Sequence, residues 1–275
     1  MAKTVSRKAL AMIMAALLTC TLGLLALTPQ SAHAAQASNT PLTTQAAAKE
    51  SIYVRSSIGD KKYTYNKYGL VTKITDTNSQ WKLTYKGTKL VKVVHALKST
   101  ATNTWRDDIE YTIAYDSKNR AKSMTVVSEG MPVNLYNNTE TYTYNKKNQV
   151  TKKVTTYKDG TPKSTVKYSY NAKGLVSKIV SSISTEALKY DAKGNKISYS
   201  CKYAANTYRV DLLSTFKNTY KSGRLTKVTQ VDGNYEFSKV IKYTKKSVPK
   251  KYAAAVKAQQ TALRGFTPGV FISQL

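Results

Sequence analysis

The chain has 275 residues, of which 44 are basic and 15 acidic, so its formal net charge is +29. Its two cysteines, Cys20 and Cys201, and two histidines exclude a disulfide framework and a zinc site of His and Cys ligands. Most basic residues are lysines, whose hydrated point charges suit diffuse attraction to a polyanion better than bidentate recognition. Alternatively, a lysine-rich surface keeps a β protein soluble and protects its strand edges.

The N-terminus has the pattern of a secretory signal peptide. Residues 1–8 carry three basic side chains, residues 9–27 are almost wholly apolar, and Ala32-His33-Ala34 supplies a small-x-small cleavage site. We therefore expect residues 1–34 to be a signal peptide and the mature protein to be secreted. An uncleaved membrane anchor remains an alternative, and a lipoprotein attached through Cys20 is a weaker one. Any membrane contact is expected through this segment alone.

Residues 35–50 are small and polar and predict a flexible linker. From residue 51 to residue 249 one phrase recurs at irregular intervals, which indicates a repeat domain. Its clear copies are YTYNKYGLVTKI at 63–74, YTYNKKNQVTKKV at 142–154, YSYNAKGLVSKI at 168–179 and LKYDAKGNKI at 188–197. Looser copies lie at 83–93, 113–124, 218–228 and 241–249.

Each copy predicts a β-hairpin. Alternation places Tyr63 and Tyr65 on one face of a strand, and Asn66 begins a type I turn. The fourth turn residue is then expected at positive φ, which Gly and Asn tolerate. These residues are Gly69, Asn119, Asn148, Gly174 and Gly194. The predicted fold is all-β: an antiparallel meander of repeated hairpins that forms a curved single sheet or a partly closed barrel, with a short C-terminal helix.

The repeated phrase resembles the YD repeat of Rhs-type bacterial surface and toxin-shell proteins. Tyr190-Asp191-Ala192-Lys193-Gly194-Asn195 is the copy most like it, followed by Tyr115-Asp116-Ser117-Lys118-Asn119-Arg120. The chain has about eight copies, usually with Asn or Lys where that family has Asp. The resemblance implies hairpins wound into an extended curved sheet, often extracellular and linked to carbohydrate or envelope contact.

Residues 250–275 are predicted to form a C-terminal helix and tail. Tyr252, Val256 and Leu263 share one helical face, and Gly265 can end the helix. We expect this helix, over residues 252–265, to cover an end of the sheet. An interfacial membrane helix is the alternative, and the final residues could add a strand.

Few residues suggest catalysis. His95 lies in a strand-like run, and no phosphate loop or dinucleotide fingerprint is present, so no cofactor, metal or enzymatic activity is expected. The exception is TWRDDIEY at 104–111, where strand alternation would place Asp108 and Glu110 on one face and Asp107 on the other. This cluster could be a sugar subsite, a Ca²⁺ contact or a counter-charge among lysines.

Lysine recurs before Ile or Val on the return strands. If the hairpins pack in register, these lysines form a column, which a polyanion lying across it would stabilise. Alternatively, duplication of the repeat copied an exposed lysine that has no role in binding. The predicted column is Lys73, Lys92, Lys153, Lys178, Lys196 and Lys227. The predicted aromatic contacts to sugar faces are Tyr65, Tyr144, Tyr170 and Trp105.

These features favour a secreted bacterial protein that binds an anionic polymer of the envelope, such as a wall polymer or an acidic glycan, without catalysis. Nucleic acid is a less suitable partner for an exported chain. One alternative is an adhesin or scaffold that binds a host or envelope protein through a sheet edge or its Tyr-rich face. Another is a glycan-acting enzyme that uses residues 107–110.

Overall fold

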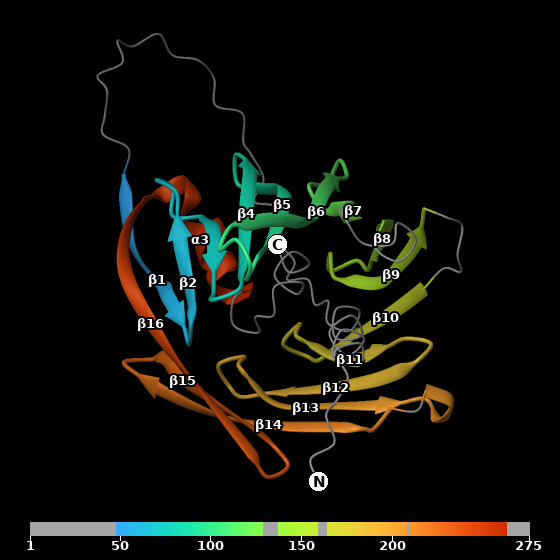
Figure 1. The fold of residues 1–275 in the computed structure, drawn as a ribbon. Helices are drawn as coiled ribbons and strands as arrows, with labels where there is room; N and C mark the ends of the chain where they lie inside the picture. Colours follow the sequence, from blue (N-terminus) through green and yellow to red (C-terminus); the bar gives the residue numbers. More distant parts are fainter. Residues whose placement is uncertain (1–47, 129–136, 159–163, 208, 263–275) are drawn as a thin grey trace.

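The computed structural model describes residues 48–128, 137–158, 164–207 and 209–262. The predicted signal peptide, most of the predicted linker and the C-terminal tail lie outside these residues. Sixteen antiparallel strands follow one another in chain order around a ring, and β1 pairs with β16 to close it (Figure 1). The fold is therefore an antiparallel closed barrel of hairpins, followed by one short helix, α3.

The strands differ in length, and the last is the longest. They are β1 Lys49–Ile58, β2 Lys61–Tyr65, β3 Val71–Thr75, β4 Ser79–Lys86, β5 Lys89–Lys98, β6 Trp105–Tyr115, β7 Ala121–Ser128, β8 Asn138–Tyr144, β9 Val150–Tyr157, β10 Ser164–Tyr170, β11 Val176–Val180, β12 Ser184–Tyr190, β13 Lys196–Tyr203, β14 Leu212–Lys221, β15 Arg224–Asp232 and β16 Tyr235–Pro249. A 3-10 turn spans Ala205–Thr207, and α3 spans Lys250–Ala262.

Closure corrects the expectation of an open curved sheet. β1 and β16 are paired from Lys49↔Pro249 to Ile58↔Ile241, with one bulge after Arg55. Each hairpin of the repeated phrase also contains a bulge beside its turn: Thr64 pairs with Lys73 and Tyr65 with Val71, so Thr72 on the return strand is the extra residue. Such bulges bend strands and stagger their register, which is what a closing sheet requires.

The hairpin turns have the expected backbone geometry. The five predicted turn residues all lie at positive φ: Gly69 at 83°, Asn119 at 61°, Asn148 at 58°, Gly174 at 76° and Gly194 at 77°. The first residue of each of these turns also stabilises the turn through hydrogen bonds of its side chain. The Oδ1 atom of Asn66 accepts hydrogen bonds from the backbone N–H groups of Tyr68 and Leu70.

The same double acceptance recurs at Asp116, Asn145, Asn171 and Asp191. Asn and Asp therefore occupy this position because their side-chain oxygen satisfies two turn donors that the strands leave unpaired.

In the described part of the chain, seven tyrosine hydroxyls each connect a strand to the strand before it, in a contact that we call a tyrosine joint. Each hydroxyl donates to a backbone carbonyl oxygen over 2.5 to 2.9 Å. The joints are Tyr65 to Arg55, Tyr85 to Val71, Tyr115 to Leu90, Tyr144 to Ala121, Tyr170 to Val150, Tyr190 to Val176 and Tyr243 to Leu225. The joints explain why the second tyrosine of the phrase is kept from copy to copy.

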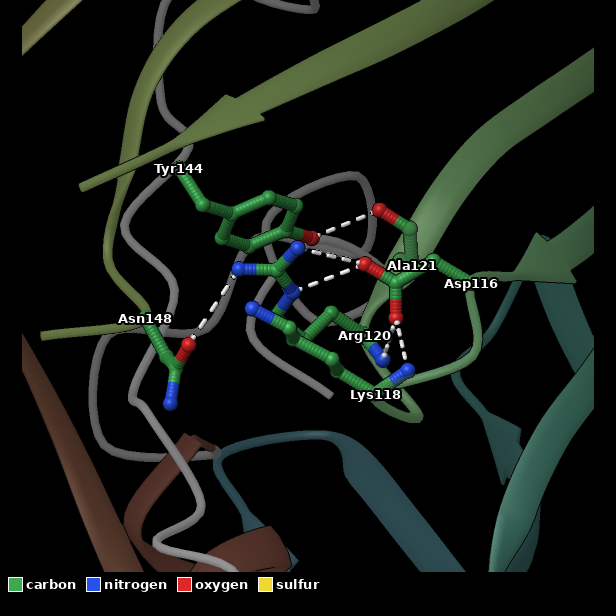
Figure 2. Close-up of polar contacts among 6 residues, drawn as sticks. All are labelled: Asp116, Lys118, Arg120, Ala121, Tyr144 and Asn148. Atoms are coloured by element: carbon green, nitrogen blue, oxygen red, sulfur yellow. Dashed lines mark hydrogen bonds and ion pairs between the residues drawn. The ribbon is translucent and has the colours of Figure 1, made fainter. Parts of the chain in front are cut away.

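Figure 2 shows the joint between the β6–β7 and β8–β9 hairpins. The Tyr144 hydroxyl reaches the Ala121 carbonyl oxygen at 2.6 Å, and the Arg120 guanidinium lies 4.5 Å from the centre of the Tyr144 ring. Arg120 also donates to Asn148 Oδ1 in the neighbouring turn and pairs with Asp116 in its own turn. One arginine therefore strengthens two successive turns and the joint between them.

The apolar side of the strands faces the interior and forms two main clusters. One joins β2 to β7 around Ile74, Leu83 and Val93, and the other joins β9 to β11 around Val166 and Ile179. Burial of these side chains, at roughly 25 cal/mol per Å² of apolar surface, is the main stabilising contribution to the fold.

The helix α3 covers the end of the barrel near the β2–β3 turn. Val256 is buried against Leu70 and Val248. Gln259 accepts a hydrogen bond from the Val71 backbone N–H, and Gln260 accepts one from that of Arg55. This confirms the predicted short C-terminal helix. Among the described residues, no helix has the length and apolarity needed to cross a membrane.

Candidate anion-binding rim

The predicted lysine column divides between the two faces of the barrel. Lys73, Lys178 and Lys227 are exposed on the outer face, and Lys92 is half-exposed there. Lys153 and Lys196 are not on that face, so the predicted column is wrong at these two positions. Lys153 is 2% exposed.

Register explains both exceptions. Lys153 lies opposite Tyr142, as Ile74 lies opposite Tyr63, and so it occupies the interior position of the repeat. Lys152 takes the exposed position instead. In the shorter copy, Lys196 lies opposite Tyr190, where other hairpins place an apolar residue.

Buried charge is paired within the barrel. The Lys153 ammonium contacts the Glu140 carboxylate at 2.5 Å, and the Tyr142 hydroxyl donates to the same carboxylate. Desolvation lowers the pKa of Lys196, an effect that the Glu186 carboxylate opposes. These lysines contribute to the interior and not to a surface.

The outward lysines do not make one flat face. Return strands lie two strands apart, about 10 Å in a sheet, and a closed barrel turns each of them in a different direction. Lys92 is also paired with Glu110 at 2.7 Å. The like-charge neighbours are instead cross-strand pairs that we did not predict, Lys73 with Lys82 and Lys152 with Lys167.

The predicted aromatic contacts have other positions. Tyr65, Tyr144 and Tyr170 are half-buried in tyrosine joints, so their rings do not form an open stacking platform. Burial raises the pKa of Tyr65 and of Tyr144 well above the ordinary value. Trp105 is exposed at the start of β6.

A bulge in β6 turns the side chains of the acidic cluster, Asp107, Asp108 and Glu110, in different directions. His95 pairs with Ile109 and Ala96 with Asp107, so Asp108 is the extra residue and points inward. The expectation that Asp108 and Glu110 share a face is therefore wrong.

Each acidic side chain of this cluster has a basic partner. Asp107 contacts Lys82 at 3.2 Å, and Asp108 contacts His95 Nδ1 at 3.2 Å. Burial lowers the pKa of His95, although Asp108 opposes the shift. Among the described residues, no group of three or more His, Cys, Asp or Glu could hold a metal ion.

Basic residues gather where the hairpins turn. In a meander every second connection lies at the same end, so the turns from β2–β3 to β14–β15 form one rim, which we call the turn rim. Each of its turns has an exposed lysine, either within the turn or, at Lys86 and Lys221, at the end of the strand that leads into it. These lysines are Lys67, Lys86, Lys118, Lys146, Lys147, Lys173, Lys193 and Lys221. At the opposite rim, the connections at residues 76–78, 99–104 and 181–183 carry no lysine, and the connection that follows β9 carries the exposed Lys158.

The acidic residues within these turns are committed to local structure. Asp116 and Asp191 each accept two backbone N–H groups, and Asp116 also pairs with Arg120. Although desolvation opposes it, hydrogen bonding from Arg120 lowers the pKa of Asp116. Both carboxylates remain ionised, but they are only two against the eight exposed lysines of the rim, and Asp116 is already paired with Arg120, so the rim stays net positive. Sequence reasoning missed this rim, although lysine at the second or third turn position was visible in five of its seven turns.

Comparisons with known proteins identify no family. No model of a protein family matches the chain, and no curated protein does. Among solved structures, the Photorhabdus luminescens Tc holotoxin pore gives 14% identity over 65% of this chain and 9% of that chain, with a TM-score of 0.31. A crystal structure of TcdB2-TccC3-Cdc42 gives 14% identity over 66% and 10%, with a TM-score of 0.32. The chain thus spans about a tenth of the length of these toxin chains.

A porin-like protein from Bacteroides uniformis gives 12% identity over 71% of this chain and 96% of that chain, with a TM-score of 0.38. Similarities with TM-scores this low carry no argument about function. The resemblance to YD repeats therefore rests on the sequence motifs alone.

Proposed function

We propose that the protein is a secreted, envelope-associated binder of an anionic polymer and that the polymer lies along the turn rim. The observation that carries the proposal is the repeated exposed lysine at every turn of this rim. The two acidic residues within the turns, Asp116 and Asp191, accept hydrogen bonds from the backbone of their own turns. A wall polymer or an acidic glycan fits both the charge and the expected secretion.

Spacing supports a flexible, repeating ligand. Neighbouring turns lie about 10 Å apart, because two strands separate them. Charges at this spacing act together on a polyanion only at low to moderate salt, since the Debye length is about 10 Å at 0.1 M. Lysine, with its compact charge and flexible stem, suits such contacts better than recognition of one fixed group.

The proposal predicts binding that depends strongly on salt. The measurement is retention of the protein on immobilised heparin and on purified wall polymer, with a neutral polysaccharide as control. Raising salt from about 50 to 200 mM should lower the affinity by on the order of tenfold or more, because bound counterions are released on association. Retention that is unchanged by salt, or equal on the neutral matrix, would contradict the proposal.

A second candidate is a protein-binding adhesin or scaffold. Large apolar side chains are exposed on β14 and β16: Leu213 is 64%, Tyr235 71% and Phe237 55% exposed. Exposed apolar groups of this size favour contact with a protein surface. Binding to a host or envelope protein with an affinity that does not change with salt concentration would support this candidate.

A further inference from the structure

The series of tyrosine joints is interrupted at one place. By its position in the repeat, Tyr220 should reach the Lys196 carbonyl oxygen. Instead, Asn218 donates to that oxygen at 3.1 Å, while the Tyr220 hydroxyl donates to the Asp191 carboxylate. The β12–β13 and β14–β15 turns are therefore connected differently from the other pairs of turns.

A cavity of about 260 Å³ lies beside this interruption. Its walls come from the two turns just named, from the β1–β16 pair that closes the barrel, and from α3. The cavity thus opens at the turn rim, at the place where the first and last strands meet. The residues that carry the argument are Tyr53, Arg55, Lys193, Asn195, Tyr220 and Arg224.

The charge of the cavity is one-sided. Arg55, Lys193 and Arg224 line it, and its described lining residues include no acidic residue. Arg55 is only 3% exposed. Its backbone is fixed by two contacts, since its N–H donates to Gln260 and its carbonyl oxygen accepts from Tyr65. A buried arginine at the edge of a cavity is a strong recognition group for carboxylate or phosphate.

Aromatic rings hold the other two cations in place. The Arg224 guanidinium lies 4.1 Å from the centre of the Tyr53 ring, and the Lys193 ammonium lies 4.1 Å from that of Tyr220. Such contacts reduce the freedom that these side chains would lose on binding, which favours affinity.

Asn195 also lines the cavity. Asn195 is 4% exposed, and its Nδ2 donates to the Tyr220 hydroxyl at 2.7 Å. Its buried Oδ1 has no hydrogen-bond partner among the described residues. An acceptor left in this state is costly, so a shift of the Asn195 side chain towards the cavity, which would let a ligand hydroxyl donate to Oδ1, would be favoured.

We propose that this cavity binds one hydroxyl-bearing unit with a single anionic group, such as a sugar carboxylate or a polyol phosphate. The volume lies below the roughly 300–1,000 Å³ of drug-sized sites, which suits a single unit. The inference rests on the proposed function, because the unit would be the end or a side branch of the polymer on the turn rim. The polymer binds diffusely along the rim, and the cavity gives it a specific contact.

The test compares two variants of the full chain that each lose two turn-rim charges. The first is Lys193→Gln with Arg224→Gln, inside the cavity. The control is Lys118→Gln with Lys147→Gln, on other turns. Calorimetric titration with galacturonate, with glycerol 3-phosphate and with neutral galactose measures affinity, and circular dichroism verifies that each variant is folded.

The wild type and the control should bind at least one of the two acids and should not bind galactose. The cavity variant should lose at least about tenfold in affinity, because hydrogen bonds to charged groups contribute at this level. Whichever acid binds identifies carboxylate or phosphate as the recognised group.

Equal affinity loss in both variants, or no binding of either acid to the wild type, would overturn the cavity proposal. Neither result bears on the salt-dependent retention of long polymer, which tests the proposed function separately. If the wild-type protein were not retained on long polymer at low salt, the proposed function would be wrong.

Discussion

The tyrosine joint between β7 and β8 predicts a measurable loss of stability when one oxygen atom is removed. In the Tyr144→Phe variant the ring remains, and so does its contact with the Arg120 guanidinium, 4.5 Å away. Only the hydrogen bond to the Ala121 carbonyl oxygen, 2.6 Å long, is lost.

The expected cost has two parts. A typical intramolecular hydrogen bond contributes about 0.5–1.5 kcal/mol, and a carbonyl left without its partner in a partly buried site adds to the loss. We therefore expect the free energy of unfolding to fall by about 1–2 kcal/mol. Equilibrium unfolding in urea, followed by circular dichroism, measures this as a lower midpoint with an unchanged slope.

The matched control is Tyr235→Phe. This tyrosine is 71% exposed, and no hydrogen bond of its hydroxyl occurs among the described residues. Its removal should change the free energy of unfolding by less than about 0.5 kcal/mol. If Tyr144→Phe behaved like this control, the joints would not hold successive hairpins together, and the explanation of the repeated tyrosine would fail.

Three further perturbations test other parts of the fold. Gly69→Ala should unfold at markedly lower urea concentration than Gly87→Ala: both have positive φ, but only at Gly69 would the new Cβ meet another side chain, at 2.5 Å. Glu140→Gln should lower the free energy of unfolding by about 3–5 kcal/mol, because it leaves the Lys153 ammonium buried without its carboxylate. The double variant with Lys153→Met should recover most of this free energy. A double variant that is no more stable than Glu140→Gln alone would refute the buried pair. Burial raises the pKa of Tyr115 to about 12 from the ordinary 10.0. Because the folded state holds this proton more tightly, the contribution of Tyr115 to stability is constant below pH 10 and falls as the pH rises towards 12. A thermal midpoint that stays flat between pH 10 and 12 would contradict it.

The local geometry of the hairpins could be read from the sequence because short-range chemistry decides it. Gly69 and Asn148 stand where the turn needs positive φ, and neighbouring residues suffice to show this. The same phrase suggested that the second tyrosine packs on a strand. It did not show that the hydroxyl reaches the strand before it, since that contact depends on the stagger between hairpins.

The faces of the return strands could not be predicted by alternation alone. A bulge beside each turn shifts the side chains by one position, so a lysine before Ile or Val has no fixed direction. In VTKKV the exposed residue is Lys152 and the buried one Lys153, and their order in the sequence does not distinguish them. Another bulge, at Asp108, separated this residue from Glu110 in the same way.

Closure of the barrel is a long-range property. The strand that closes it, β1, lacks the repeated phrase and pairs with the most distant strand of the chain. The cavity beside Tyr220 depends on the same closure, because Arg55 and Tyr53 come from β1 while Lys193 and Arg224 come from the last hairpins. No local pattern brings these residues together.

The most direct test of the account asks which lysines a polyanion contacts. One variant changes Lys118, Lys146 and Lys147 on the turn rim to Gln, and the other changes the outer-face residues Lys73, Lys178 and Lys227. Each loses three exposed charges, and the affinity of each for purified wall polymer is measured at low salt. The account predicts a substantially larger loss of affinity in the turn-rim variant. An equal loss, or a larger loss in the outer-face variant, would contradict it.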